Sequence, residues 1–385
     1  MRFTTAGESH GPGLIAVVEG IPAGLELSPD DFNVDLARRQ LGHGRGGRMK
    51  IEKDAAAVLS GIRHGRTLGS PVALSMPNRD YANWEERMNP WPVDADVPEV
   101  HLPRPGHADL TGTQKYGLTD VRNVLERASA RETTARVAAG GLARAFLRAL
   151  GVEVRSHVTR IGSVVTDAPE RALELADFDH VDESPVRCLD AEVTRAMMKE
   201  IDVERKNNES LGGIFEVLVF GCVPGLGSYS SWETRIEGRL AQAINSIQAI
   251  KGVGFGDGFD LAGRVGSQAH DEIFPGDDGK YQRHTNRAGG IEGGMTNGET
   301  VVIKAAMKPL PTLTKPLKSV DIATGEATEA LRERTDSCTV PAAGVVGEAM
   351  VALVMADAYL EKFGGDHIDD CKQAVAAYRE RLARS

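Results

Sequence analysis

The strongest constraint on this chain is the segment 120–141, DVRNVLERASARETTARVAAGG. It is rich in alanine and contains no proline, so we predict a single helix with Asp120 as its N-cap. At roughly 100° per residue, one face of this helix is apolar. The residues that share this face are Val124, Ala128, Ala135, Ala138, Leu142 and Phe146. Their small size indicates close packing, and Gly140 and Gly141 are expected to loosen the helix before it continues to residue 150.

Two arginines, Arg127 and Arg131, fall on the same apolar face. A buried guanidinium without an anion is costly. The nearby carboxylates of Glu126 and Glu132 point elsewhere on the helical wheel. Two interpretations remain open. The arginines bind a ligand anion, or they form salt bridges to distant acidic residues or snorkel at the helix start.

The composition bounds the class of protein. At 385 residues the chain is long enough for one large or two ordinary domains, and its 41% apolar and 26% charged residues are those of a soluble globular protein. A net charge of −10 argues against a general nucleic-acid binder. We find no apolar run near the ~20 residues of a membrane span, and Arg2, Glu8 and His10 interrupt any leader. The four cysteines show no metal spacing and suit reduced thiols in the cytoplasm.

Hydrophobic patterns predict a mixture of strands and helices. We expect strands at residues 1–5, 14–19, 56–62, 72–76, 153–165, 213–222 and 300–307, and helices at 31–41, 191–207, 234–247, 345–363 and 371–384. Gly20-x-x-x-Gly24-Leu25 and Gly221-x-x-x-Gly225-Leu226 each follow a strand and precede a helix. This echo indicates an internal duplication. The polar stretches 78–99 and 267–285 are interpreted as surface loops, the second of them mobile.

Several rigid or glycine-rich segments carry residues suited to chemistry. His10 lies among very small neighbours, so a ligand can approach it, although a turn histidine in water is the simpler alternative. Arg104, His107 and Asp109 stand in a loop stiffened by two prolines, which is how a catalytic side chain is held. Residues 42–48, GHGRGGR, offer arginine forks for phosphate or carboxylate; a nucleic-acid RGG segment is the competing interpretation.

Taken together, these segments predict a site for a polyanionic ligand, with histidines as proton donors and an aspartate as base or orienting group. Zinc-ligand spacing, a GxSxG nucleophile and a GxGxxG strand–helix turn are all missing from the sequence. From the residues alone, the prediction is a phosphate-handling enzyme.

Four motifs in order carry a more specific resemblance: residues 7–11 (GESHG), 104–109 (RPGHAD), 127–133 (RASARET) and 286–294. With them the chain, from residue 1 to about 360, resembles the chorismate synthase family. The resemblance implies a flavin-dependent lyase, the last enzyme of the shikimate route. Such an enzyme converts 5-enolpyruvylshikimate 3-phosphate to chorismate and phosphate by 1,4-anti elimination and requires reduced FMN without consuming it.

The resemblance also implies an α+β fold, a layered sandwich with long helices packed between antiparallel sheets. We expect one domain over residues 1–385 with a peripheral C-terminal helix at 366–385, assembled as a homotetramer. No flavin-reductase domain accompanies it in the sequence. The implied partners are therefore the substrate and an external source of reduced flavin, with NADPH involved only indirectly, and with neither nucleic acid nor membrane.

By position, the family implies catalytic roles for three residues. His10 would protonate the reduced flavin, His107 the departing phosphate, and Asp336 would help the flavin collect the C6 proton. The implied FMN contacts are Arg127, Ala128, Ser129, Gln248, Ala249, Gly293, Lys308, Pro309, Leu310, Pro311, Thr312 and Arg334. Arg39 and Arg45 match positions for NADP or a substrate anion. The candidates for substrate binding are Ser9, Arg48, Arg104 and Arg131. No metal is implied.

Two rival classes remain open at this stage. An Arg/Gly nucleic-acid module would bind RNA in a salt-sensitive way, but the net charge and the lack of interleaved aromatics disfavour it. A flavodoxin-like electron carrier would be a much shorter acidic chain, and it would give no role to two histidines in rigid loops.

Overall fold

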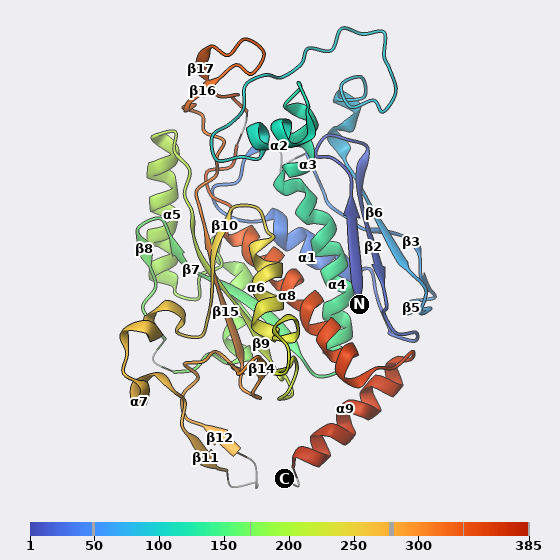
Figure 1. Ribbon diagram of the computed structural model, residues 1–385, viewed down its shortest axis with the longest axis vertical. Coiled ribbons are helices and arrows are strands. Elements are labelled where there is room, and N and C mark those ends of the chain that lie inside the picture. The colour runs from blue at the N-terminus through green and yellow to red at the C-terminus, as the bar shows by residue number, and fades with distance from the viewer. Residues whose placement is uncertain (48–50, 170, 277–280, 334, 384–385) are drawn as a thin grey trace.

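Two antiparallel sheets enclose a layer of long helices (Figure 1). The computed structural model describes residues 1–47, 51–169, 171–276, 281–333 and 335–383. One sheet has the order β1-β2-β6-β3, and the other has the order β10-β15-β9-β7-β8. Their bounds are β1 Arg2–Ala6, β2 Gly13–Glu19, β3 Ala57–Ser60, β6 Val72–Pro77, β7 Glu153–Ile161, β8 Val164–Val165, β9 Gly213–Phe220, β10 Ile250–Phe255 and β15 Val301–Met307.

The helices between the sheets form the core. α4 (Thr133–Ala149) packs on β2 and β6, α8 (Val340–Phe363) packs on β7 and β9, and the two helices pack on each other. α1 (Asp30–Gln40) lies against both of them, and α6 (Ile236–Asn245) lies against α8. Gly140 permits the contact of α4 with α8, because a Cβ there would collide with Ala349. The predicted fold class, long helices packed between antiparallel sheets, is confirmed.

The remaining elements lie around this sandwich. The helices are α2 Asp109–Tyr116, α3 Arg122–Ala128, α5 Ala191–Lys206, α7 Gly266–Ala269 and α9 Ile368–Leu382. The short hairpins are β4 Ile62–Arg63 with β5 Arg66–Thr67, β11 Ile273–Pro275 with β12 Tyr281–Arg283, β13 Ile291–Glu292 with β14 Met295–Thr296, and β16 Lys318–Val320 with β17 Ala327–Glu329. The interpretation of 267–285 as a plain loop was therefore wrong. α9 reaches the body through Ile368, Cys371 and Val375; its peripheral role and the single-domain assignment stay predictions.

The two halves of the chain repeat one topology, as the glycine echo predicted. In sheet order, β1-β2-β6-β3 corresponds strand by strand to β7-β9-β15-β10. Along the chain, α1 and α6 follow the second strand of each set, and α4 and α8 follow the final strands, β6 and β15. Gly24 and Gly225 have φ of 81° and 82°, which favours glycine. The backbone N–H of Gly24 donates to the carbonyl of Thr67 at 2.9 Å, and that of Gly225 donates to Thr296 at 2.7 Å. Equivalent glycines thus make equivalent bonds.

The long helix predicted for 120–141 is interrupted, and this prediction was wrong in two respects. α3 ends at Ala128, Ser129 takes an extended conformation with ψ 143°, and the short 3-10 turn η3 (Ala130–Glu132) leads into α4. Ser129 caps this turn, since its side chain accepts a hydrogen bond from the Arg131 N–H. Gly140 and Gly141 do not loosen α4, which runs unbroken to Ala149. The side chain of Asp120 does receive the N–H of Arg122, at 2.8 Å.

α8 corrects the sequence estimate of apolar runs. With 24 residues, this helix is long and apolar enough to cross a membrane by length and composition, and it is the only such helix among the described residues. However, 89% of its apolar window is buried inside the protein. Both faces of this helix are covered, by α4 on one side and by β7 and β9 on the other. It is the core helix of the fold.

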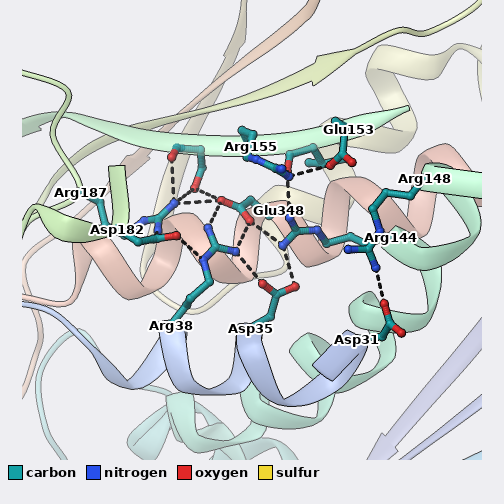
Figure 2. A network of polar contacts seen from close by, with 12 residues as sticks. Asp31, Asp35, Arg38, Arg144, Arg148, Glu153, Arg155, Asp182, Arg187 and Glu348 are labelled. Atoms are coloured by element: carbon teal, nitrogen blue, oxygen red, sulfur yellow. Dashed lines mark hydrogen bonds and ion pairs between the residues drawn. The ribbon is translucent and has the colours of Figure 1, made fainter. Parts of the chain in front are cut away.

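One buried charged side chain, Glu348 in α8, ties the layers together (Figure 2). Arg38 of α1 grips its carboxylate with two bonds, at 2.7 and 2.9 Å. Arg144 of α4 and Arg187 add bonds at 2.9 and 3.0 Å. Burial alone would raise the pKa of Glu348, but the three guanidinium groups hold it far below its usual range. Asp35 and Asp182 pair with the same arginines, so the cluster balances three positive against three negative charges.

Replacing Glu348 with alanine is expected to lower the free energy of unfolding by about 3–5 kcal/mol, because three buried guanidinium groups lose their shared anion. Chemical denaturation of both proteins measures the loss. Glu361→Ala is the matched control on the same helix: Glu361 is exposed and pairs with Arg239 at 2.8 Å, so its loss is expected to stay below about 1 kcal/mol. Equal losses in the two variants would contradict the account.

Candidate active site

The interruption at Ser129 sends the two arginines of the segment in different directions. Arg127, with 42% of its side chain exposed, donates to the carbonyls of Thr5 at 2.9 Å and Gly7 at 3.0 Å. Arg131 is only 3% exposed and donates to Asp54 at 2.6 Å and to Asn78 at 3.0 Å. Nη2 of Arg127 also lies 3.8 Å from Oε1 of Glu132, so the expectation that this nearby carboxylate points elsewhere was wrong. The alternative, a salt bridge to a distant acidic residue, holds for Arg131.

His10 is held between a carboxylate and an indole ring. Its Nδ1 lies 2.9 Å from Oε1 of Glu126, and its backbone N–H donates to Oε2 of Glu126 at 2.8 Å. The imidazole stacks on Trp84 with ring centroids 4.0 Å apart. The neighbouring Ser9 is buried, and its N–H donates to the Glu126 carbonyl at 3.0 Å. The simpler reading of His10 as a histidine in open water does not hold.

His107 has a carboxylate partner of its own. Its Nδ1 contacts Oδ1 of Asp109, which is completely buried. Arg104 donates from Nε to Oδ2 of Asp109 at 2.9 Å, and from Nη1 to Thr312 at 3.1 Å and Glu333 at 3.0 Å. Burial alone would raise the pKa of Asp109, but hydrogen bonds from His107 and Arg104 lower it to about 2. Asp109 is therefore ionised at neutral pH and orients His107.

The predicted loop 308–312 lies against the loop that carries His107. Nζ of Lys308 donates to the Gly106 carbonyl at 2.5 Å, and the Lys308 N–H donates to the Ala249 carbonyl at 2.9 Å. The carbonyl of Leu310 accepts from Ser210 at 2.8 Å. Pro309 and Pro311 stiffen this loop, as they do in the sequence prediction. Lys308, Leu310 and Thr312 thus anchor one wall of the site to its neighbours.

A second group of predicted residues gathers around Arg39. Its Nε donates to Thr133 at 2.9 Å, and its Nη2 donates to the Ala130 carbonyl of η3 at 2.9 Å. Burial, offset in part by Asp54 and reinforced by Arg45 and Arg131, lowers the pKa of Arg39 to about 9. Nη1 of Arg39 and Nη2 of Arg131 are buried and form no hydrogen bond among the described residues, although they lie 3.5 Å from Oδ2 of Asp54 and 3.6 Å from Oε2 of Glu52, respectively. Such donors are costly unless a ligand satisfies them.

Asp336 lies at the edge of this arginine group. Its Oδ1 accepts from the Gly46 N–H at 2.5 Å, and its Oδ2 lies 3.4 Å from Nε of Arg45. The Ser337 N–H donates to the Gly44 carbonyl at 2.8 Å, which fixes the two segments side by side. The glycine-rich loop of residues 42–47 therefore positions a carboxylate and an arginine together. Arg48 lies outside the described residues.

On the other side of the interruption, Arg127 lines an open hollow of about 420 Å³. Phe3, Met350 and Gln248 line it too, with Glu132 and Arg136. Oε1 of Gln248 is buried and has no hydrogen-bond partner among the described residues. Ala128 and Ser129 follow Arg127 at the interruption. Ala249, next to Gln248, links this hollow to the loop of Lys308.

One predicted FMN contact among the described residues, Gly293, is not brought to this hollow. Gly293 sits in the turn between β13 and β14, before the start of β15, whereas Lys308 follows its end. A strand of this length spans roughly 20 Å, so the two lie at opposite ends of the sheet. Arg334 lies outside the described residues.

Four residues of the site were missed or misjudged at the sequence level: Glu126, Trp84, Asn78 and Asp54. Glu126 lies on another face of α3 from Arg127, as predicted, but its contact with His10, which comes from a distant segment, was missed. Asn78 follows β6 and donates to the carbonyls of Glu8 and Gly11 at 3.1 and 2.7 Å while it accepts from Arg131. A polar residue directly after an apolar strand was the only sequence signal for it.

Comparison with known proteins gives one consistent result. A family model described as chorismate synthase matches residues 1–360. The chain is 57% identical to the chorismate synthase of Rubrobacter xylanophilus over 99% of this chain and 97% of that protein. It is 54% identical to that of Alkaliphilus metalliredigens over 98% and 99%. A solved crystal structure described as chorismate synthase superposes with a TM-score of 0.81 at 43% identity, covering 100% of this chain and 98% of that one.

The Asp109 carboxylate is expected to make the protein acid-sensitive. Its folded-state pKa of about 2 lies below the ordinary 3.8, so its contribution is complete above the ordinary value and is lost as the pH falls toward 2. Between about pH 7 and about pH 3 this loss amounts to about 1 kcal/mol of unfolding free energy. Asp109→Asn lacks the ionisable carboxyl group. The difference in unfolding free energy between the wild type and this variant is therefore expected to be smaller at about pH 3 than at about pH 7, by about 1 kcal/mol.

Chemical denaturation at the two pH values measures this narrowing. Asp96→Asn, at an exposed position, is the control and is expected to show a gap that does not depend on pH. A constant gap for Asp109→Asn as well would show that Asp109 is not held ionised by its neighbours.

Proposed function

The chain belongs to the chorismate synthase family, and from this premise we propose how its residues carry out the reaction. Its activity is that of a chorismate synthase, a carbon–oxygen lyase of the shikimate pathway, which supplies aromatic amino acid biosynthesis. Family membership implies 5-enolpyruvylshikimate 3-phosphate as the substrate. The observation that carries our proposal is the pair of histidines, His10 and His107, each bound through Nδ1 to a buried carboxylate beside guanidinium groups.

The arginine group around Arg39 is our proposed substrate site. The substrate carries two carboxylates and one phosphate, and planar guanidinium forks match such groups. Nη1 of Arg39 and Nη2 of Arg131 form only long ion pairs, at 3.5 and 3.6 Å, and no hydrogen bond among the described residues, which supports this assignment. Ser9, Arg45 and Arg48 are proposed as further members. Arg45 and Arg131 lie close enough to Arg39 to help lower its pKa, so we assign Arg39 and Arg45 to a substrate anion in this group rather than to NADP. Arg104 donates hydrogen bonds to Asp109, Thr312 and Glu333. We therefore propose that it orients His107 and does not bind the substrate.

The family uses reduced FMN, and we propose that the hollow beside Arg127 binds it. A volume of about 420 Å³ is within the usual range for ligand pockets. The half-exposed guanidinium of Arg127 suits a phosphate, and the unpartnered Oε1 of Gln248 suits an N–H donor. Ala128, Ser129, Ala249 and residues 308–312 would complete the walls. When bound, reduced FMN supplies electron density to the C–O cleavage and recovers it by the end of the reaction.

The proton transfers are assigned to side chains of this chain. His107, oriented by Asp109, holds the proton that the departing phosphate takes up. His10 keeps the flavin site protonated, and Asp336, whose Oδ2 lies 3.4 Å from Nε of Arg45, assists removal of the C6 proton. General acid–base groups of this kind typically contribute 10²–10⁴-fold in rate. Reduced flavin comes from an external source, since we assign no reductase activity to this chain.

We also propose that the protein assembles as a homotetramer in the cytoplasm. β3 is an edge strand with all four residues exposed, among them Leu59 at 63% and Val58 at 42%. Exposed apolar edges are normally covered by another chain. If Gly293 contacts FMN, it does so from a second copy, because it lies far from Lys308 within one chain. All four cysteines are free and buried, which suits a reducing compartment.

His107→Ala is expected to reduce anaerobic turnover of 5-enolpyruvylshikimate 3-phosphate with photoreduced FMN by roughly 10²-fold or more, since the departing phosphate loses its acid. Chorismate absorbance follows the reaction. The control is His101→Ala in the same loop, because the His101 side chain is partly exposed and forms an ion pair with the exposed Glu99 at 2.9 Å. Wild-type turnover in His107→Ala would keep the family activity and remove His107 as the acid.

Leu59→Lys is expected to weaken the assembly by roughly 100-fold or more, because the new charge would be buried at the edge of β3. Sedimentation analysis over a concentration series measures the change. Val203→Lys, at an exposed position on α5, controls for the added charge. An unchanged assembly in Leu59→Lys would show that β3 is not part of an interface.

A further inference from the structure

We propose that Glu126 and Trp84 are positioning residues for His10, and that together they make Nε2 the ring nitrogen that exchanges the proton. This inference rests on the role proposed above for His10. It adds to the reaction two residues that touch His10 from different parts of the chain, α3 and the segment that follows β6.

Glu126 holds His10 at two separate atoms. Its Oε2 accepts the backbone N–H of His10 at 2.8 Å, and Nδ1 of the ring lies 2.9 Å from Oε1 and 3.0 Å from Oε2. The Glu126 carbonyl also accepts the Ser9 N–H. One residue of α3 therefore fixes both the backbone and the ring of the turn that presents His10.

The protonation state of Glu126 determines the tautomer of His10. Burial alone would raise the pKa of Glu126, but hydrogen bonds and charge from His10, together with Arg122, hold it below its ordinary value. An ionised carboxylate has only acceptors. The hydrogen in the Nδ1 contact must therefore belong to the ring, so His10 carries a proton on Nδ1 and exchanges protons through Nε2.

Trp84 fixes the plane of the ring. The two rings stack with centroids 4.0 Å apart and planes 23° apart. Trp84 is itself held, because its Nε1–H donates to Asp80 at 3.1 Å. With one face against indole and Nδ1 against Glu126, rotation of the imidazole about its side-chain torsions breaks one contact or the other.

Arg122 couples the two positioning residues. Its Nη1 donates to Oε1 of Glu126 at 3.0 Å, and its guanidinium carbon lies 5.1 Å from the Trp84 ring centroid. Arg87 lies over the same ring at 5.4 Å. A guanidinium over an aromatic face is attractive. Among the residues that the structure describes, the charged groups that contact His10 or Trp84 include Glu126 and Arg122 on α3, with Asp80 and Arg87 beyond Trp84.

The same construction occurs at His107, where Nδ1 contacts the ionised Asp109. Two histidines in unrelated loops share one orientation toward a buried carboxylate. This orientation fixes the tautomer in each case, as carboxylate partners do for other catalytic imidazoles.

Neutron diffraction from deuterated crystals of the wild-type protein tests the tautomer directly. We expect deuterium on Nδ1 of His10, facing Glu126. In Glu126→Ala we expect the Nε2-protonated tautomer to appear. Deuterium on Nε2 alone in the wild type would overturn the proposal, and this result does not depend on any variant folding.

Kinetics provide the second readout. Glu126→Ala is expected to lower kcat by roughly 10²-fold, as wrong-tautomer histidines do, with little change in KM. Formate is expected to restore part of the lost activity of Glu126→Ala, and formamide is not, because only the carboxylate is an acceptor without donors.

Trp84→Ala is expected to lose activity, and Trp84→Phe is expected to keep it, because phenylalanine still offers a ring to stack on His10. Glu85→Ala, at an exposed neighbouring position, is the control.

The role of His10 and its positioning by Glu126 and Trp84 can be tested separately. Full activity in His10→Gln would remove the proposed role of His10. A severe loss in His10→Gln with wild-type kcat in both Glu126→Ala and Trp84→Ala would keep that role and overturn the positioning by Glu126 and Trp84.

Discussion

The interruption of the helix at Ser129 is the constraint on which the site depends. In an unbroken helix, Arg127 and Arg131 would lie one turn apart on one face. The extended Ser129 separates them instead: Arg127 turns to β1 and the open hollow, and Arg131 turns to Asp54 and Asn78. The carbonyl of Ala130 in η3, which accepts the Thr133 N–H, also receives a hydrogen bond from Arg39 at 2.9 Å. One local break in the backbone thus separates the hollow that we propose for FMN from the arginine group that we propose for the substrate.

The repeated topology explains where the site lies. In each half, a long connection follows the strand that comes last in the chain, β6 or β15, and leads to a central helix: residues 78–132 before α4 and residues 308–339 before α8. These two connections meet, with Arg104 bonded to Thr312 and Lys308 to the carbonyl of Gly106. The Glu348 cluster fixes α1, α4 and α8 beneath them (Figure 2). A rigid helical layer therefore supports chemistry built on loops.

The sequence predicted the elements with clear periodicity and the motif residues, because apolar spacing and rigid glycine or proline loops are local signals. It did not predict the break at Ser129, because the alanine-rich composition favours a continuous helix. The bonds that compete with helix formation join Arg127 to Thr5 and Arg131 to Asn78 and Asp54, and these partners lie in distant segments. Glu126, Asn78 and Asp54 were missed for the same reason. Their roles depend on partners more than 50 residues away, as with Glu126 and His10, and no local pattern marks them.

The most direct test of this division is a crystal structure of the protein with oxidised FMN and 5-enolpyruvylshikimate 3-phosphate bound together. The account predicts the flavin in the hollow against Arg127 and Gln248, and the substrate anions on Arg39 and Arg131, on the other side of Ser129. Both ligands on one side of the interruption, or substrate anions that touch neither Arg39 nor Arg131, would contradict it.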